Sequence, residues 1–249
     1  MRVCVCVCVC VCVCSGPEYT HTHTNTHTHT HTHTHTHTHT YMYTYIYVYV
    51  QARMRSDPRL EQMFGVQIAT NQIEEGVAAA ALASQSGARF VDLNCGCPIY
   101  DATRRGVGAA LLRRPDKLAR LATEIAAASQ LPITVKIRTG PGSEGSENVL
   151  ELVQRLAESK AIAAVSIHGR TTQQRYHRPA NWAIIEAAAQ VARGVDPDLV
   201  VVGNGDVLTH YENAARRAAS PAVQVRCVCV CVCVDVCVCV CMMYMYMYM

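Results

Sequence analysis

The sequence predicts an α/β fold, part of a (β/α)8 or TIM barrel, from two features of its middle region. Apolar runs there each end in a polar residue, and stretches of helical character lie between them. The five runs begin at Phe64, Val91, Thr134, Val165 and Val200. This alternation is typical of parallel strands joined by crossover helices. The polar residues would then lie at the carboxyl ends of strands, where such barrels have their active sites.

The segments between the predicted strands carry helix signals. An Ala-rich run over 73–86 has Glu74 and Glu75 in its first turn, where they complement the helix dipole, and Gly87 ends it. Further helices are predicted over 118–128, 149–156 and 182–191. A complete barrel has eight strands and about 250 residues. We therefore expect a partial barrel of about five β/α units, with an unpaired strand at each edge of its sheet.

Both ends of the chain consist of two-residue alternations. Residues 3–14 and 227–241 alternate Val with Cys, 21–40 alternate His with Thr, and 41–50 and 244–249 are rich in Tyr. A dinucleotide repeat in DNA, read in triplets, encodes such an alternation in any frame. Translated repeat DNA beside a real coding segment is therefore the simplest origin of both ends.

The chain of 249 residues thus divides into three segments. We predict low-complexity repeats over 1–50, a barrel fragment over 51–226 and low-complexity repeats over 227–249, with disordered or poorly defined geometry in both flanks. The amino terminus resembles a secretory signal, which we interpret as an accident of the repeat. No membrane segment is predicted, because the apolar runs are short and the second one is interrupted by Asp235. We expect a location in the cytoplasm or nucleus.

Cysteine is abundant, but its placement argues against a metal centre. All but two of the fifteen cysteines lie in the Val-Cys repeats. Cysteines two apart on a strand point to one face, which does not give a closed tetrahedral zinc arrangement. We predict no metal site, with metal binding or a disulfide framework as the alternative.

Basic residues gather after the second predicted strand, although the net charge of the chain is only +3. The cluster consists of Arg104, Arg105, Arg113, Arg114, Lys117 and Arg120. Such a cluster beside an active-site rim suits a polyanionic substrate, because phosphate contacts dominate the affinity for nucleic acid. A solvated helix face is an equally open interpretation.

The two cysteines outside the repeats differ in their setting. Cys97 lies between a glycine and a proline, in a sharp turn that follows a strand, with Asn94 three residues before it. A thiol presented there to the cleft can act as an acid or a nucleophile. Cys95 lacks this setting, and we interpret it as a packing residue.

Other strand ends also carry chemically useful groups. Lys136 and Arg138 alternate along one strand and point to the same face, where two cations need an anion or an electron-rich ring. His168 ends the next strand. Residues 203–206 (GNGD) form a tight turn whose backbone N–H groups can bind a phosphate.

Together these runs resemble the tRNA-dihydrouridine synthases, flavoenzymes with an FMN-binding barrel, and most closely the eukaryotic type acting on the variable-loop uridine. The resemblance covers about residues 60–220. It is carried by 64–67 (FGVQ), 91–99 (VDLNCGCPI), 133–140 (ITVKIRTG), 168–176 (HGRTTQQRY) and 203–206 (GNGD). It implies FMN-dependent reduction of uridine to 5,6-dihydrouridine in tRNA, with NADPH as reductant.

The resemblance also implies roles for individual residues. The residue matching Cys97 is the general acid, which protonates C5 of the uracil after a hydride reaches C6. Flavin contacts are implied for Gln67, Lys136 and His168. Binding of the flavin phosphate is implied for the turn of Asn204, Gly205 and Asp206. Substrate contacts are implied for Asn94 and Arg138.

The sequence departs from the family pattern at both ends. A first strand with Pro-Met, a Gly-Arg-Gly phosphate loop on the last strand and a helical tRNA-binding domain do not occur in it. We therefore expect a chain truncated at both ends and not competent as an enzyme. Two alternatives stay open: another FMN-barrel oxidoreductase acting on a small molecule, and an inactive fragment that binds RNA. The expected partner is tRNA, with no stable protein partner.

Overall fold

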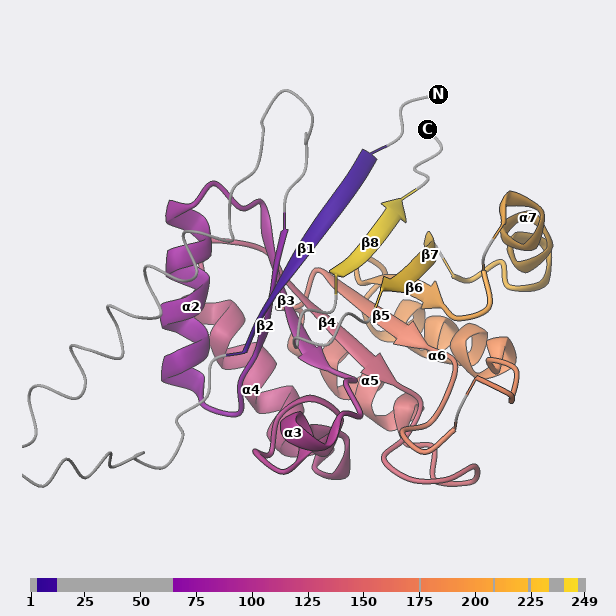
Figure 1. Cartoon of the computed structure of the whole chain (residues 1–249), viewed down its shortest axis with the longest axis horizontal. Helices are drawn as coiled ribbons and strands as arrows, with labels where there is room; N and C mark the ends of the chain where they lie inside the picture. Colours follow the sequence, from indigo (N-terminus) through magenta and orange to yellow (C-terminus); the bar gives the residue numbers. More distant parts are fainter. Residues whose placement is uncertain are drawn as a thin grey trace, which may run out of the picture.

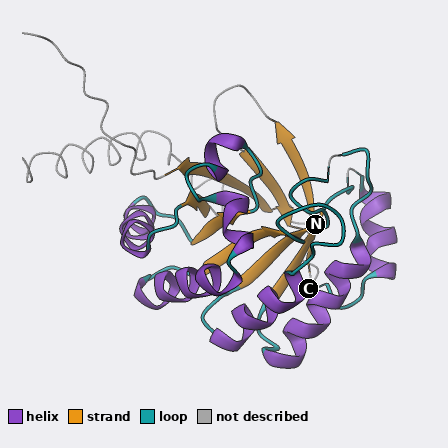
Figure 2. Ribbon diagram, turned by 90° about the horizontal axis from the view of Figure 1, so that it is seen from below, coloured by secondary structure: helices purple, strands orange, loops and turns teal. Residues whose placement is uncertain are grey.

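Eight strands form a closed barrel, in sequence order, within the residues that the computed structural model describes. Those residues are 4–12, 65–174, 176–207, 209–223, 225–232 and 240–245. The helices lie outside the ring of strands (Figures 1 and 2). This arrangement leaves the barrel interior to the side chains that point away from the helices.

The central part of the barrel consists of five parallel strands, each hydrogen-bonded to the next. They are β2 (Gly65–Ala69), β3 (Phe90–Cys95), β4 (Ile133–Arg138), β5 (Ala164–His168) and β6 (Val200–Asn204). All five coincide with the apolar runs singled out in the sequence. The predicted α/β barrel architecture is therefore confirmed.

The helices follow the predicted segments and extend several of them. The long ones are α2 (Ile73–Gln85), α4 (Pro115–Ala128), α5 (Val149–Ser159) and α6 (Trp182–Val195). Gly87 follows α2 with a φ of 84°, as its predicted role at the helix end requires. Three elements were not predicted: α3 (Tyr100–Thr103), the 3-10 helix η1 (Gly108–Arg113) and α7 (His210–Ala219).

The repeat tracts supply the strands that close the ring. These are β1 (Cys4–Cys12), β7 (Val225–Val232) and β8 (Val240–Met245). The expectation of an open sheet with two unpaired edges is wrong, because β1 and β7 pair with the two edges of the central sheet. Alternating β-branched valine favours extended backbone, and the edge strands β2 and β6 offer it hydrogen-bonding partners. The rest of both flanks lies outside the described residues.

One strand departs from the pattern of a regular (β/α)8 barrel. β8 runs antiparallel to both of its neighbours, β1 and β7, whereas β1 is parallel to β2 and β7 is parallel to β6. β8 therefore directs its amino end toward the mouth at which β2–β6 end. The loops that follow the five central strands therefore lie around that mouth.

The two faces of the central strands differ in character. One face is apolar and packs on the helices, with Ile68, Leu93, Ile137 and Ile167 at most 2% exposed. The alternate positions carry polar residues, which strand geometry turns toward the barrel interior. TIM-barrel interiors are usually filled by branched apolar side chains. A polar interior therefore indicates a place for a polar ligand.

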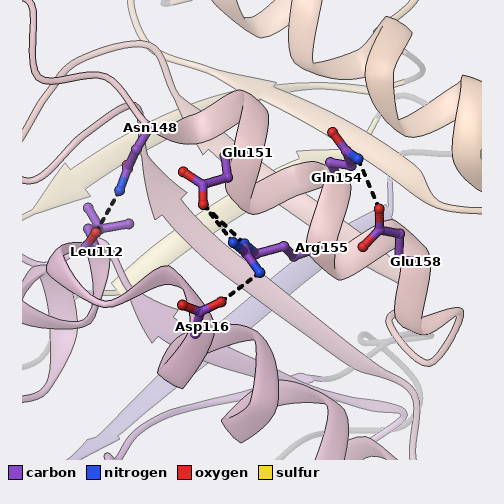
Figure 3. Close-up of polar contacts among 7 residues, drawn as sticks. All are labelled: Leu112, Asp116, Asn148, Glu151, Gln154, Arg155 and Glu158. Atoms are coloured by element: carbon purple, nitrogen blue, oxygen red, sulfur yellow. Dashed lines mark hydrogen bonds and ion pairs between the residues drawn. The ribbon is translucent and has the colours of Figure 1, made fainter.

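Polar contacts link α5 to α4, and the residue before α5 to η1, on the outside of the barrel (Figure 3). Arg155 reaches Asp116 at 2.6 Å and Glu151 at 2.8 Å, and Asn148 Nδ2 donates to the carbonyl oxygen of Leu112 at 2.7 Å. The two ion pairs are solvent-exposed, so each contributes little stability. Among the described residues, no helix combines the length and apolar character that a membrane span requires.

Candidate functional site

The register of the strands brings the interior polar residues into three rows. The deepest row contains Gln67, Asp92 and Thr134. The next contains Asn94, Lys136 and Ser166, and the row nearest the carboxyl ends contains Arg138, His168 and Asn204. Residues far apart in the sequence thus share one face of the sheet at one end of the barrel.

Three buried side chains of β2 and β3 form a continuous hydrogen-bonded group. Gln67 Nε2 donates to Asp92 Oδ2 at 2.6 Å, and Asn94 Nδ2 donates to Gln67 Oε1 at 3.1 Å. Gln67, Asp92 and Asn94 are 3%, 7% and 8% exposed. The group is therefore part of the buried wall of the interior.

Asp92 is an acidic residue that the sequence analysis did not assign to the site. Burial raises the pKa of its carboxyl group, opposed by hydrogen bonds from Thr134 and Gln67 and by the charge of Lys136. An acidic residue therefore lies beside Lys136, on the neighbouring strand. The sequence signal was an aspartate two positions before Asn94, on the same face of an otherwise apolar strand.

Cys97 lies in the turn that follows β3, and its backbone is fixed on both sides. Its N–H donates to Asn94 Oδ1 at 3.1 Å, and its carbonyl oxygen accepts from the N–H of Ala109 at 2.9 Å. The side chain is half-buried and packs against Ala69, Ala102 and Val107. The thiol is thus held at the mouth and not in the core.

Cys95 occupies the opposite environment, although it is only two residues away. It is 1% exposed and belongs to the apolar core between the sheet and the helices. Burial raises the pKa of its thiol well above the ordinary value. This agrees with its interpretation as a packing residue.

Arg138 joins the loops that follow β3 and β5. Its Nε donates to the carbonyl oxygen of Gly96 at 3.1 Å, and its Nη1 donates to that of Thr171 at 2.9 Å. The side chain is 9% exposed, whereas Lys136, two residues earlier, is half-buried. Arg138 therefore helps to fix the turn that carries Cys97.

His168 and Arg170 form a second buried group at the end of β5. Arg170 Nη1 lies 3.1 Å from His168 Nε2. A guanidinium can only donate, so this contact suits an imidazole whose Nε2 accepts. Arg170 also donates to the carbonyl oxygen of Arg178 at 2.7 Å and to Asp206 Oδ1 at 2.6 Å.

The turn after β6 packs closely against His168. Gly205 has a φ of 113°, and a Cβ there would lie 2.9 Å from His168 Cδ2. Trp182 Nε1 donates to the carbonyl oxygen of Gly205 at 2.9 Å, and Asp206 Oδ2 accepts from the N–H of Ala180 at 2.6 Å. The Asp206 carboxylate thus holds the turn in place.

Two buried polar atoms of the interior remain without a hydrogen-bond partner among the described residues. They are Asn204 Nδ2 and Ser166 Oγ. A buried donor without a partner costs free energy, so such atoms in an interior face commonly mark a ligand or water position. They fit a polar group bound in the mouth.

The structure therefore brings all nine predicted site residues to the carboxyl ends of β2–β6. They are Gln67, Asn94, Cys97, Lys136, Arg138, His168, Asn204, Gly205 and Asp206. It adds Asp92, Arg170 and Ser166, which sequence reasoning missed. The described residues contain no group of His, Cys, Asp and Glu side chains able to hold a metal ion.

Two further features lie outside this group. The six basic residues that were predicted to form a cluster are all exposed, along α3, η1 and α4. A cavity of about 660 Å³ lies between α6, α7 and the loop after β4, lined in part by Glu144, Arg178, Trp182 and Arg216. We place the candidate site in the barrel mouth, because the buried polar residues converge there and not in that cavity.

Comparison with known proteins identifies a family with a matching sequence pattern. A family model described as dihydrouridine synthase matches residues 21–225. The proteins named tRNA-dihydrouridine(47) synthase [NAD(P)(+)] from Coprinopsis cinerea and Candida albicans are 41% and 40% identical, over 61% and 60% of this chain. The matched part spans about a quarter of their length, 24% and 27%.

A solved structure of similar shape is a phosphoenolpyruvate phosphomutase from Streptomyces platensis subsp. rosaceus. It is 21% identical with a TM-score of 0.48, and the match covers 72% of this chain and 62% of that one. A similarity at this level carries no argument about the reaction.

Proposed function

Because this chain belongs to the dihydrouridine synthase family, we propose that its barrel serves the reduction of uridine in tRNA to 5,6-dihydrouridine, with FMN as cofactor and NADPH as reductant. The named relatives place the reaction at tRNA position 47, and we propose the same uridine here. The chain spans about a quarter of the length of these relatives. The activity of the whole protein is therefore part of the proposal.

The observation that carries the proposal is the position of Cys97. It is a half-buried thiol on a turn fixed by Asn94 and Ala109, beside a polar barrel interior. Its neighbour Cys95 is buried in the core with a raised thiol pKa. Only one of these two cysteines is placed to exchange a proton with a ligand in the mouth.

The interior residues fit an FMN group. Asn204 Nδ2 and Ser166 Oγ lack partners among the described residues, and both belong to the interior face of β5 and β6. We propose that the flavin is held by Gln67, Lys136 and His168, with its phosphate at the turn of Asn204, Gly205 and Asp206. When bound, FMN supplies the hydride for C6 of the uracil.

The residues of the chain would provide orientation and one proton. We propose that Cys97 Sγ donates a proton at C5 of the uracil. Asn94 and Arg138 fix the turn of Cys97 through the N–H of Cys97 and the carbonyl oxygen of Gly96, and they are placed to contact the base. A positioned general acid commonly contributes about 10²- to 10⁴-fold to a rate.

The test uses the full chain, FMN, NADPH and a tRNA that lacks dihydrouridine. We expect the visible absorption of a bound flavin and a nucleoside heavier by two hydrogens at position 47. A chain that binds flavin but leaves the tRNA unchanged would contradict the reaction. Reduction of a small enone under the same conditions would favour the alternative FMN-barrel oxidoreductase.

A second candidate function is RNA binding without catalysis. The exposed cluster of basic side chains along α3, η1 and α4 favours it. Binding through phosphates weakens steeply as salt rises. Salt-sensitive tRNA binding by a chain that never takes up flavin would support this candidate, and neutral replacements in the cluster should then abolish the binding.

A further inference from the structure

We infer that Asp92 is a positioning residue for Cys97: its carboxylate sets the orientation of the two amide side chains that lie between them. The inference rests on the proposed function only for the role of Cys97 as the acid. The arrangement itself is a property of the described residues of β2, β3 and the turn after β3.

The contacts run in one direction from the carboxylate to the turn. Gln67 Nε2 donates to Asp92 Oδ2 at 2.6 Å, and Asn94 Nδ2 donates to Gln67 Oε1 at 3.1 Å. Asn94 Oδ1 then accepts from the N–H of Gly96 at 3.3 Å and from that of Cys97 at 3.1 Å. Each step links a donor to an acceptor, and all three linking side chains are buried.

The chemistry of the first group determines the orientation of the others. An ionised carboxylate can only accept, so Gln67 must turn its NH₂ group toward Asp92 and its oxygen toward Asn94. Asn94 must then turn its NH₂ group toward Gln67, which leaves its oxygen for the N–H groups of the turn. The N–H groups of Gly96 and Cys97 require the same orientation from the other end of the series. Without Asp92, the buried NH₂ group of Gln67 loses its acceptor, and the series is oriented from the turn alone.

The protonation of Asp92 does not reverse this order. Its second oxygen, Oδ1, lies 2.6 Å from Thr134 Oγ1, a hydroxyl that can either donate or accept. A proton on Asp92 can therefore reside on Oδ1 and point to Thr134, while Oδ2 continues to accept from Gln67. The positive charge of Lys136 favours the ionised form of Asp92.

A reversed amide would act directly on the turn of Cys97. It would place an NH₂ group against the backbone N–H groups of Gly96 and Cys97, donor against donor, in a buried position. The turn would then lose one of its anchors, and the Cys97 thiol would no longer be held in one position. Asp92 thus acts on the thiol through Gln67 and Asn94.

Hydrogen exchange of backbone amides tests this inference in the full chain, without flavin or RNA. Asp92→Leu removes the acceptor, and Gln67→Met breaks the same series one step further along. We expect the amides of Gly96 and Cys97 to exchange about 5- to 30-fold faster in both variants, as the loss of a buried hydrogen bond implies. Using both variants keeps the test decisive if one of them fails to fold.

Asp92→Asn is the conservative rescue. Its side-chain oxygen can still accept from Gln67, and its NH₂ group can donate to Thr134, so we expect exchange close to that of the wild type. Asp196→Leu is the matched control, because Asp196 is also a buried aspartate (8% exposed) but lies after α6, where its Oδ1 accepts from the N–H of Asp198. It should leave the two amides unchanged.

Each outcome bears on either the inference or the function. Wild-type exchange at Gly96 and Cys97 in Asp92→Leu, or equal acceleration in Asp92→Asn, would overturn the role of Asp92. Equal acceleration in Asp196→Leu would show a general loss of stability and would also overturn it. If the predicted pattern appears but the wild type never forms dihydrouridine, the proposed function fails and the positioning role stands. If dihydrouridine forms, Asp92→Leu should lower kcat far more than it raises KM.

Discussion

Arg170 and Asp206 form an ion pair that joins the loops after β5 and β6. Arg170 Nη2 lies 2.6 Å from Asp206 Oδ1, and the two side chains are 2% and 33% exposed. The same guanidinium contacts His168 Nε2, and the same carboxylate accepts from the N–H of Ala180. One pair therefore links the imidazole of His168 to the turn that follows Asn204 and holds that turn in position.

Removing the carboxylate of this pair should destabilise the protein. In Asp206→Ala, the guanidinium of Arg170 stays buried without its counter-charge, and the N–H of Ala180 loses its acceptor. We expect a loss of about 1–3 kcal/mol in the free energy of unfolding. Urea denaturation measures it, with Asp198→Ala as control, since Asp198 is exposed. Equal effects of the two substitutions would show that the ion pair contributes nothing.

Gly205→Ala should distort the same turn. The backbone there has a φ of 113°, which L-residues rarely adopt, and the added Cβ would lie 2.8 Å from Ala180 Cβ and 2.9 Å from His168 Cδ2. We expect backbone strain to lower the free energy of unfolding by about 1–3 kcal/mol. We also expect weaker flavin binding, because His168 must move. Denaturation and flavin titration measure the two effects.

Gly194→Ala is the matched control for that substitution. Gly194 lies within α6, and a Cβ added there would have open space around it, with no atom of the described residues within 4 Å. Alanine is the better helix former, so we expect the free energy of unfolding to rise by about 0.5–1 kcal/mol. A similar loss from both substitutions would mean that the crowding at Gly205 is not the cause.

The strands and most site residues could be predicted because each is visible in a single stretch of sequence. An apolar run that ends in Gln67, Lys136 or His168 shows both the strand and the residue at its end. Asp92 and Arg170 could not be assigned in this way, because their partners lie on other strands or loops. The register between β2 and β3 places Asp92 beside Gln67, and the fold of the loops after β5 and β6 brings Arg170 to Asp206.

The closure of the barrel could not be predicted for a different reason. The Val-Cys repeats carry β propensity but no signal for direction or partner. Their use as β1 and β7 follows from the unpaired edges that β2 and β6 would otherwise expose. The short elements α3 and η1 have too few residues to show a helical period.

The pKa of Asp92 predicts a specific dependence of stability on pH. Burial raises this pKa above its ordinary value of 3.8, so the folded state binds the proton more tightly than the unfolded state. Protonated Asp92 therefore stabilises the folded state fully below pH 3.8. This stabilisation is lost as the pH rises through the pKa that Asp92 has in the folded state. Asn at this position keeps the hydrogen bonds and does not ionise.

We therefore expect Asp92→Asn to gain stability relative to the wild type as the pH rises through this window, and the difference to be constant above it. Urea midpoints of both proteins across the acidic range to neutrality measure the difference. A difference that grows as the pH falls would show that the carboxylate is stabilised by Lys136 more than it is destabilised by burial.

The two cysteines of the turn provide the sharpest test of the catalytic assignment. Cys97→Ala removes a half-buried thiol that packs against Ala69, Ala102 and Val107, none of which is proposed to hold FMN, so flavin binding should persist. Uridine reduction should fall by about 10²- to 10⁴-fold, because the proton at C5 loses its donor. Cys95→Ala removes a thiol that burial keeps protonated in the core, so turnover should be almost unchanged. Single-turnover reoxidation of reduced flavin by tRNA measures both, and equal effects of the two substitutions on that rate would disprove the assignment of Cys97 as the acid.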